Sequence, residues 1–180
     1  MRKVIAIDPG SEESGYVIVE KDTYRVLAKG KKPNEEVLGI LIKTLFEASE
    51  SLEEMPEVAI EMVASYGMPV GREVFETCVW IGRFIEACAG FPVRLERIYR
   101  AEEKLAICKN PKANDATIRR ALADRFAYGE PNYGKGTKKK PGWFYGFSAD
   151  VWQAYAVAVT YIDRTKGENK HEGNESCEGN

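Results

Sequence analysis

Short apolar segments alternate with longer amphipathic ones along most of this chain. Apolar or alternating segments predict β-strands over residues 4–8, 16–20, 24–30, 58–61 and 93–98. The first three strands follow one another through a Ser/Gly-rich turn and through Lys21-Asp22, so we expect an antiparallel meander. Pro9-Gly10 ends the first strand at once, which places Asp8 at the carboxyl edge of the sheet.

Apolar residues at the helical period of about 3.6 predict helices between and after these strands. One helix begins at Asn34, and a long one carries Val74 to Cys88. Three more are expected over 101–108, from a cap at Asn114, and over 148–163. This order predicts an α/β fold with a mixed five-stranded sheet flanked by helices, antiparallel over the first three strands and parallel where helices cross over.

The length and composition suit one globular domain, with 180 residues, 44% of them hydrophobic and 30% charged. We expect this domain to cover residues 1–163. Residues 164–180 are polar and lack periodicity, which predicts a disordered tail. No stretch approaches the roughly 18 uninterrupted apolar residues of a membrane span, and Met1-Arg2-Lys3 leads directly into a strand. We therefore expect a cytoplasmic protein with no membrane partner.

The cysteines do not indicate a zinc site or a disulfide framework. Cys78, Cys88, Cys108 and Cys177 show no CxxC spacing, and the single histidine, His171, lies in the polar tail. Zinc sites and disulfide frameworks are recognised by their spacing, which is missing from this chain.

The net charge of −2 conceals an uneven distribution of charge along the chain. Residues 1–93 hold 10 Lys and Arg against 16 Asp and Glu, whereas residues 94–149 hold 13 against 6. Residues 131–149 carry four lysines and no acid, interleaved with Tyr133, Trp143, Phe144, Tyr145 and Phe147. Lysines that neutralise phosphates, beside aromatics that stack on bases, favour a nucleic-acid contact; solvated helix faces are the alternative. The basic candidates are Arg72, Lys112, Arg119, Lys135, Lys138, Lys139 and Lys140.

Three acidic residues stand at the ends of apolar segments that are far apart in the chain. Asp8 closes VIAID, Glu61 closes VAIE, and Asp150 opens the apolar run of the last helix, where the helix dipole favours an anion. Carboxylates that meet in a low-dielectric site repel one another unless a cation is shared between them. The pattern therefore predicts a Mg²⁺ site. The alternatives are that Asp8 is a turn residue and that Glu61 pairs with a base such as Arg94.

Several segments carry a resemblance to a known family. IAIDPGSEESGYVIVE resembles the first motif of the RuvC-type Holliday junction resolvases, which belong to the RNase H-like nucleases. AIEM, with Glu61, resembles the second carboxylate of the family, and VFETCVWIGRF resembles the region that approaches DNA. SADVWQAYAVAVTYID resembles the last motif, in which two aspartates three positions apart begin a helix. The resemblance covers roughly residues 3–163.

The chain departs from this pattern at Gln153, where the family has its second helical aspartate. A glutamine can bind a metal or a water through its amide oxygen, but it brings no charge and cannot act as a base. Asp115 is a candidate for the missing acid if its helix reaches the site. The favoured alternative is that Asp115 is an ordinary first-turn acid behind the Asn114 cap.

The resemblance implies an endonuclease that resolves four-way DNA junctions as a homodimer, with the 74–88 helix as a candidate interface. Acids without a nearby histidine or nucleophilic serine fit phosphodiester hydrolysis with two Mg²⁺ ions per site, Mn²⁺ being a possible substitute. Asp8 would bridge the ions, Glu61 and Asp150 would each bind one, and Gln153 would complete a shell. In the loop after Glu61, Tyr66 and Met68 are candidates for insertion at the branch point.

Two alternatives to a junction resolvase stay open. One is a nuclease of the same fold that acts on other branched DNA or on structured RNA. The other is a junction-binding protein with a crippled metal site that does not cleave, which Gln153 keeps open. Trp80, Phe84, Trp152 and Tyr155 recur at helical spacing and are expected in the core rather than against DNA.

Overall fold

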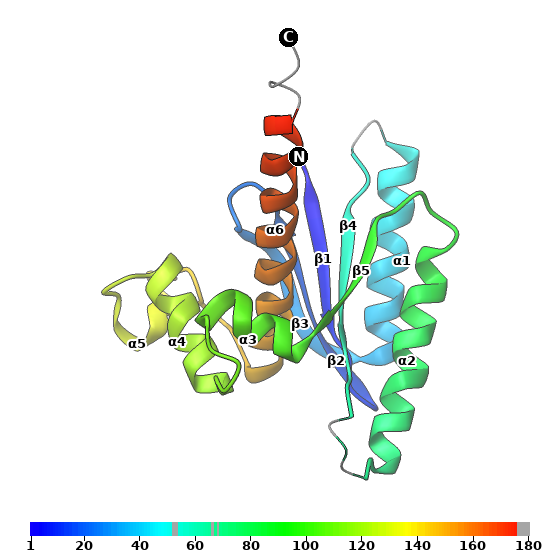
Figure 1. Cartoon of the computed structure of the whole chain (residues 1–180), viewed down its shortest axis with the longest axis horizontal. Helices are drawn as coiled ribbons and strands as arrows, with labels where there is room; N and C mark the ends of the chain where they lie inside the picture. Colours follow the sequence, from blue (N-terminus) through cyan, green and yellow to red (C-terminus); the bar gives the residue numbers. More distant parts are fainter. Residues whose placement is uncertain (52–53, 66, 68, 176–180) are drawn as a thin grey trace.

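A five-stranded mixed sheet forms the centre of the computed structural model, and helices cover both of its faces (Figure 1). The structure describes residues 1–51, 54–65, 67 and 69–175, of which 169–175 are described by their backbone alone. The strands are β1 (Lys3–Asp8), β2 (Glu13–Glu20), β3 (Val26–Pro33), β4 (Glu57–Met62) and β5 (Leu95–Tyr99).

The strand order across the sheet is β3-β2-β1-β4-β5. The β1–β2 and β2–β3 pairs are antiparallel, and the β1–β4 and β4–β5 pairs are parallel. The predicted mixed sheet is therefore confirmed. β1 is an inner strand covered on both faces, which explains why its residues 4–7 are all apolar and at most 1% exposed.

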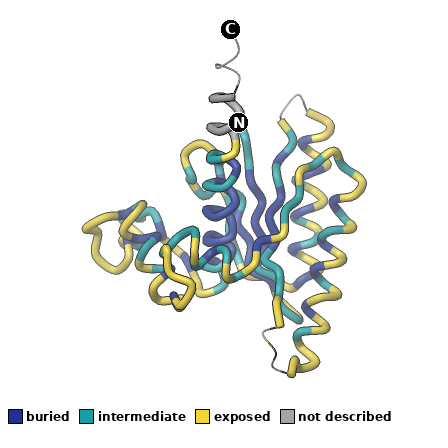
Figure 2. Tube along the Cα trace, in the orientation of Figure 1, coloured by how far each residue is buried: buried dark blue, intermediate teal, exposed yellow. Residues whose placement is uncertain are grey.

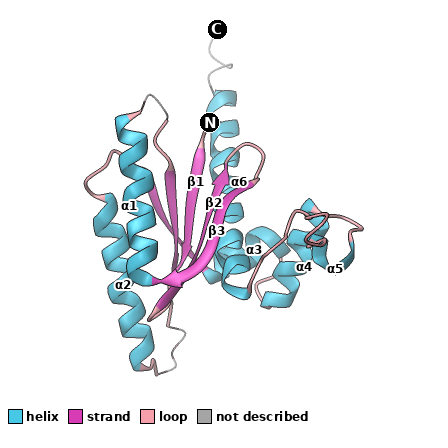
Figure 3. Cartoon of the chain, turned by 180° about the vertical axis from the view of Figure 1, so that it is seen from behind, coloured by secondary structure: helices cyan, strands magenta, loops and turns pink. Residues whose placement is uncertain are grey.

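The helices form two layers, one on each face of the sheet (Figures 1 and 3). One layer consists of α1 (Asn34–Glu50) and α2 (Arg72–Cys88). The other is α6 (Ala149–Glu175), with three shorter helices beside its N-terminal half. These are α3 (Arg100–Cys108), α4 (Asp115–Phe126) and α5 (Pro131–Gly134).

Each face of the sheet packs against its own hydrophobic core. Successive residues of a strand point to opposite faces, so Ile5 and Ile7 join the core under α1 and α2, while Val4 and Ala6 join the core under α6. Figure 2 shows the buried positions concentrated in the central strands and in α6. The expected core aromatics Phe84, Trp152 and Tyr155 are buried, and Trp80 is half-buried.

The last helix ends later than its predicted end at residue 163, so that prediction was wrong. α6 does not end at Asp163 but continues to Glu175. Its polar extension still contacts the domain, because Arg164 pairs with Glu96 and Glu102, and Thr165 is 1% exposed. Residues 176–180 lie outside the described part of the chain. No helix within that part is both long and apolar enough to cross a membrane.

Two further differences lie in loops. β3 begins at Val26 rather than Tyr24, because Tyr24 adopts a positive φ of 62° in the turn that precedes the strand. The short helix α5 was not predicted, and its residues Asn132 and Tyr133 have left-handed backbone angles. The Asn114 cap was predicted, and its side chain accepts a hydrogen bond from the backbone N–H of Thr117.

A candidate carboxylate centre at the edge of the sheet

Asp8 and Glu61 are neighbours because their strands run parallel and in register. Ile7 of β1 lies opposite Ile60 of β4, so the next residue of each strand emerges at the same carboxyl edge. Their two side chains share a hydrogen bond. The edge of a parallel sheet is where α/β folds commonly bind ligands.

The turn after Asp8 is held by a fully buried side chain from α1. The amide of Asn34 donates to the carbonyl of Gly10 at 3.0 Å, and its oxygen accepts from the Ser14 hydroxyl at 2.6 Å. These bonds attach the Pro9-Gly10 turn to the start of α1. The position of Asp8 is therefore set from both sides of the sheet.

Burial and neighbouring carboxylates make the Asp8–Glu61 pair difficult to ionise fully. Burial, and then the charges of Glu61, Glu103 and Asp150, raise the pKa of Asp8 to about 9. Burial also raises the pKa of Glu61, while the hydrogen bond from Asp8 opposes that shift. Without a cation, full ionisation of both carboxyl groups at neutral pH is therefore unfavourable.

Asp150 reaches the pair because the first turn of α6 lies directly on β2. Gly15 is the β2 partner of Asp8. A methyl group at Gly15 would lie 2.5 Å from the carbonyl oxygen of Asp150, so only glycine allows this approach. The Asp150 carboxylate itself is about one-third exposed and stands 3.7 Å from the Lys31 ammonium.

A fourth carboxylate, Glu103, lies in the first turn of α3 and was missed at the sequence level. Its side chain is 0% exposed and pairs with Arg100, which also pairs with Asp115. Burial, and then the charge of Glu61, raise the pKa of Glu103 to about 9. Against the effect of burial, Arg100 and then Gln153 lower the pKa of the Asp115 carboxyl. The expected ordinary first-turn role of Asp115 is thus incomplete, because its carboxylate joins α4 to α3 through Arg100.

The donor chemistry of this edge fits a hard divalent cation. Among the described residues, no group of three or more His, Cys, Asp or Glu side chains is arranged to hold a metal ion. The oxygens of Asp8, Glu61 and Asp150 are nevertheless the ligand type that Mg²⁺ prefers. Oε1 of Glu103 is also buried with no hydrogen-bond partner. A cation would relieve both the repulsion and this unsatisfied oxygen.

Arg94 is not the partner of Glu61. Its guanidinium pairs with Glu96 at one end of β5 and with Glu168 on α6. That alternative is wrong for Arg94, because β5 directs Arg94 to the opposite end of the strand from the carboxylate edge. The positive charge of Arg100 instead acts on Glu61 and lowers the pKa of its carboxyl against the larger effect of burial.

The predicted DNA contacts lie at several places around the fold. Arg72, at the start of α2, lines a pocket of about 390 Å³ with Ser11 and Glu12 of the turn that follows Asp8. Arg119 lies over the Trp152 ring at 5.8 Å, and its Nε is buried without a hydrogen-bond partner. Among the lysines predicted to contact DNA, the exposed ones are Lys112, Lys138, Lys139 and Lys140, whereas Lys135 is half-buried. Tyr66 and Met68 lie outside the described residues.

The aromatic residues of the 131–149 segment are mostly structural. Phe144 and Phe147 are buried, and Phe144 stacks on Trp152 at 4.3 Å. Trp143 stacks on Phe126 at 5.4 Å. The expectation that Phe144 and Phe147 stack on bases was wrong, because both are buried against α6. Trp143 packs on α4 through Phe126 and is half-buried. Only Tyr133 and Tyr145 of this set are exposed.

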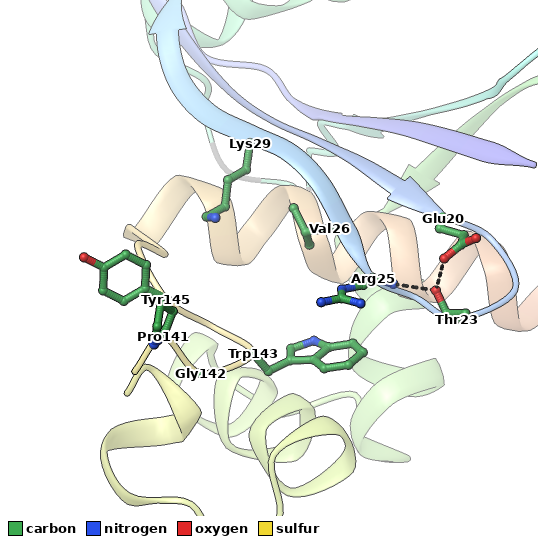
Figure 4. A pocket seen from close by; sticks show the side chains of 9 residues that line it. All are labelled: Glu20, Thr23, Arg25, Val26, Lys29, Pro141, Gly142, Trp143 and Tyr145. Atoms are coloured by element: carbon green, nitrogen blue, oxygen red, sulfur yellow. Dashed lines mark hydrogen bonds between the residues drawn. The ribbon is translucent and has the colours of Figure 1, made fainter. Parts of the chain in front are cut away.

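The anchored segment forms a pocket of about 710 Å³ against the edge strand β3 (Figure 4). Lys29 projects into it from β3, and Arg25 projects into it from the turn before β3. Both lie opposite Trp143 and Tyr145. Sequence reasoning missed both bases because they precede the basic half of the chain. The pocket is separate from the carboxylate edge, but Lys31, two residues along β3 from Lys29, reaches Asp150.

Comparison with known proteins identifies the fold. No family model and no curated protein matches the sequence. The structure of RuvC from Thermus thermophilus matches with a TM-score of 0.62 at 18% identity, over 92% of this chain and 96% of that one. A T. thermophilus RuvC in complex with a Holliday junction substrate matches with a TM-score of 0.61 at 17% identity, over 93% and 97%. This chain has the RuvC fold.

The RuvC fold accounts for the convergence of residues that are distant in sequence. Its parallel β1–β4 pair places Asp8 beside Glu61, and its last helix places Asp150 over Gly15. The two matches cover nearly the whole of both chains, so the likeness extends to the α3–α5 side of the molecule as well.

Proposed function

We propose that this protein is a divalent-metal-dependent endonuclease that resolves four-way DNA junctions. One observation carries the proposal: on a RuvC fold, the hydrogen-bonded Asp8–Glu61 pair stands at the sheet edge with Asp150 docked beside it. A matching RuvC is known in complex with a Holliday junction substrate, which supports the choice of DNA.

Asp8, Glu61 and Asp150 would hold the cations. Mg²⁺, or Mn²⁺ in its place, supplies a hydroxide nucleophile and stabilises the departing 3′ oxygen when two ions are bound. Asp8 is flanked by Glu61 on β4 and by Asp150 on α6, so its carboxylate is the best placed to bridge two ions. A bound cation would favour the ionised form of Asp8, whose pKa burial and neighbouring carboxylates raise in the free protein.

Gln153 would position a cation or a water rather than take part in the reaction itself. Its amide lies close enough to the Asp115 carboxyl to lower the pKa of that group, and its amide oxygen can bind a cation or a water. An amide does not take up a proton at neutral pH, so it cannot replace a general base.

The DNA would contact basic residues on both sides of the carboxylate edge. Arg72 lies beside the β1–β2 turn, and Lys31 beside Asp150. From Lys31, the bases of β3 lead to the pocket of Figure 4, where Arg25 and Lys29 can neutralise phosphates and Tyr145 is exposed. The lysines at 138–140 would extend this contact along one arm of the junction.

A homodimer would provide the paired cuts that a two-fold symmetric junction needs. α2 offers a surface for it, because Phe75 and Val79 lie one helical turn apart and are 61% and 60% exposed. Exposed apolar side chains grouped on one helix face are typical of an interaction surface.

The decisive experiment compares labelled four-way, flap and linear DNA in the presence of Mg²⁺ or EDTA. We expect symmetric nicks in the four-way junction with Mg²⁺ alone. Asp8→Asn should abolish cleavage and retain junction binding, whereas Asp124→Asn, an exposed acid on α4, should cleave as the wild type does. Binding without nicks would favour the non-cleaving alternative, which Gln153 supports. Equal cutting of flaps would favour a less selective nuclease.

A further inference from the structure

Glu103 is a fully buried carboxyl group whose hydrogen bonding is incomplete. It is 0% exposed, its Oε2 accepts from Arg100, and its Oε1 is buried with no hydrogen-bond partner. A buried carboxyl group with one unsatisfied oxygen destabilises a fold, and an apolar side chain in its place would not. A residue of this kind calls for a ligand that the free chain does not supply.

The position of Glu103 connects it to the proposed metal centre. β5 pairs with β4 so that Glu61 lies opposite Ile98, and α3 begins two residues later at Arg100. Glu103 therefore lies in the helix that follows β5, the strand next to β4. Its charge acts on Asp8, and the charge of Glu61 acts on it.

Arg100 does not neutralise Glu103 completely. Its guanidinium is divided between Glu103 and Asp115, so one positive charge serves two carboxylates. Glu103 therefore keeps one oxygen, Oε1, that no side chain of the described residues satisfies.

We propose that Glu103 is a fourth carboxylate ligand of the metal centre, supplying from α3 the negative charge that Gln153 does not supply from α6. The inference rests on the proposed function and deepens it. Three carboxylates balance less of the charge of two divalent cations than four carboxylates do. Glu103 would be the fourth carboxylate. Its free Oε1 is the ligating atom.

The test measures metal binding separately from cleavage. Mn²⁺ is titrated by calorimetry into Glu103→Gln, with Glu102→Gln as the matched control on the same helical turn. Glu102 accepts from the Tyr99 backbone in a capping box that glutamine preserves. We expect Glu103→Gln to weaken Mn²⁺ binding about tenfold or more, the scale of a lost partner in a metal site. The control should bind as the wild type does.

A rescue variant separates a ligand from a structural ion pair. If Glu103 supplies charge to the cations, adding Gln153→Asp to Glu103→Gln should recover most of the lost Mn²⁺ affinity. If Glu103 only holds Arg100, Glu103→Gln should lower the melting temperature and leave Mn²⁺ affinity within twofold, which would overturn the proposal. Should Glu103→Gln not fold, Glu103→Asp keeps the charge but shortens the reach, and unchanged Mn²⁺ affinity in it would overturn the proposal as well.

Failure of this inference is distinguishable from failure of the proposed function. If only the inference fails, Asp8→Asn loses both Mn²⁺ binding and cleavage, while Glu103→Gln binds Mn²⁺ normally. If the proposed function fails, the wild type does not cleave and Asp8→Asn does not change Mn²⁺ binding. A wild-type protein that shows no saturable Mn²⁺ binding would overturn both.

Discussion

Replacing Gly15 by alanine tests how the site is assembled without removing any reactive group. Gly15 has no positive φ, so alanine fits the β2 backbone and its effect is purely steric. The added methyl group would lie 2.5 Å from the carbonyl oxygen of Asp150, 2.8 Å from its carbonyl carbon and 3.0 Å from its Cβ. Two of these are backbone atoms, so no side-chain rotation can relieve the contact.

The size of the displacement follows from these distances. Moving from 2.5 Å to the 3.4 Å of an ordinary contact requires the first turn of α6 to retreat from β2 by about 0.9 Å. A misplacement of about 1 Å in a reacting group costs on the order of 100-fold in rate. Overpacking of this kind also costs about 1–3 kcal/mol of stability. We expect Gly15→Ala to lose about 100-fold in Mg²⁺-dependent cleavage and to keep its junction affinity.

The assay pairs single-turnover cleavage of a labelled four-way junction with thermal melting. Gly39→Ala is the control, because Gly39 lies in α1 with no atom within 4 Å of an added methyl group. Alanine there should stabilise the helix by up to about 1 kcal/mol and leave cleavage unchanged. Cleavage by Gly15→Ala within twofold of the wild type would refute the idea that this contact positions Asp150.

Three further predictions concern charge and assembly. In EDTA, the pKa of Asp8 is about 9 in the folded protein and near 4 in the unfolded chain. The stability that results is fully present below about pH 4 and is lost as the pH rises to about 9, so the melting temperature should fall over that range. Asp8→Asn should flatten the dependence; an unchanged slope would contradict the shift. Lys29→Ala should weaken junction binding and lower the slope of log affinity against log salt by about 1, whereas Lys43→Ala, on α1, should do neither. Equal effects would argue against the β3 contact. Phe75→Asp should shift sedimentation toward the monomer and uncouple the paired nicks; an unchanged dimer would exclude α2 as the interface.

Sequence reasoning was most successful where the information is local. The buried run VIAID and the Pro-Gly that follows it predicted both β1 and the location of Asp8 at its end. Helical periodicity predicted the helix that begins at Asn34, and the buried residues Val37, Leu41 and Leu45 of α1 recur at that period. Register then brought Glu61 beside Asp8, which follows from parallel pairing once the topology is known.

Glu103 escaped notice because its sequence context is ordinary. An acid in the first turn of a helix usually complements the helix dipole in solvent, as Glu102 does beside it. The difference between the two neighbours arises from the 100° rotation per residue that turns Glu103 inward where α3 packs on α6. An Arg three positions before a Glu, directly after a predicted strand, was the available signal.

The sequence by itself determined the types and order of the elements and the acids at the strand ends, because these depend on periodicity and on chain neighbours. Only the tertiary structure decided which carboxylates are buried together, that Asp115 forms an ion pair with Arg100, and that α6 contacts β2 at Gly15. Those features depend on contacts between segments far apart in the chain. Burial and pairing set the electrostatic energy of a carboxylate, and neither is encoded in the residues next to it.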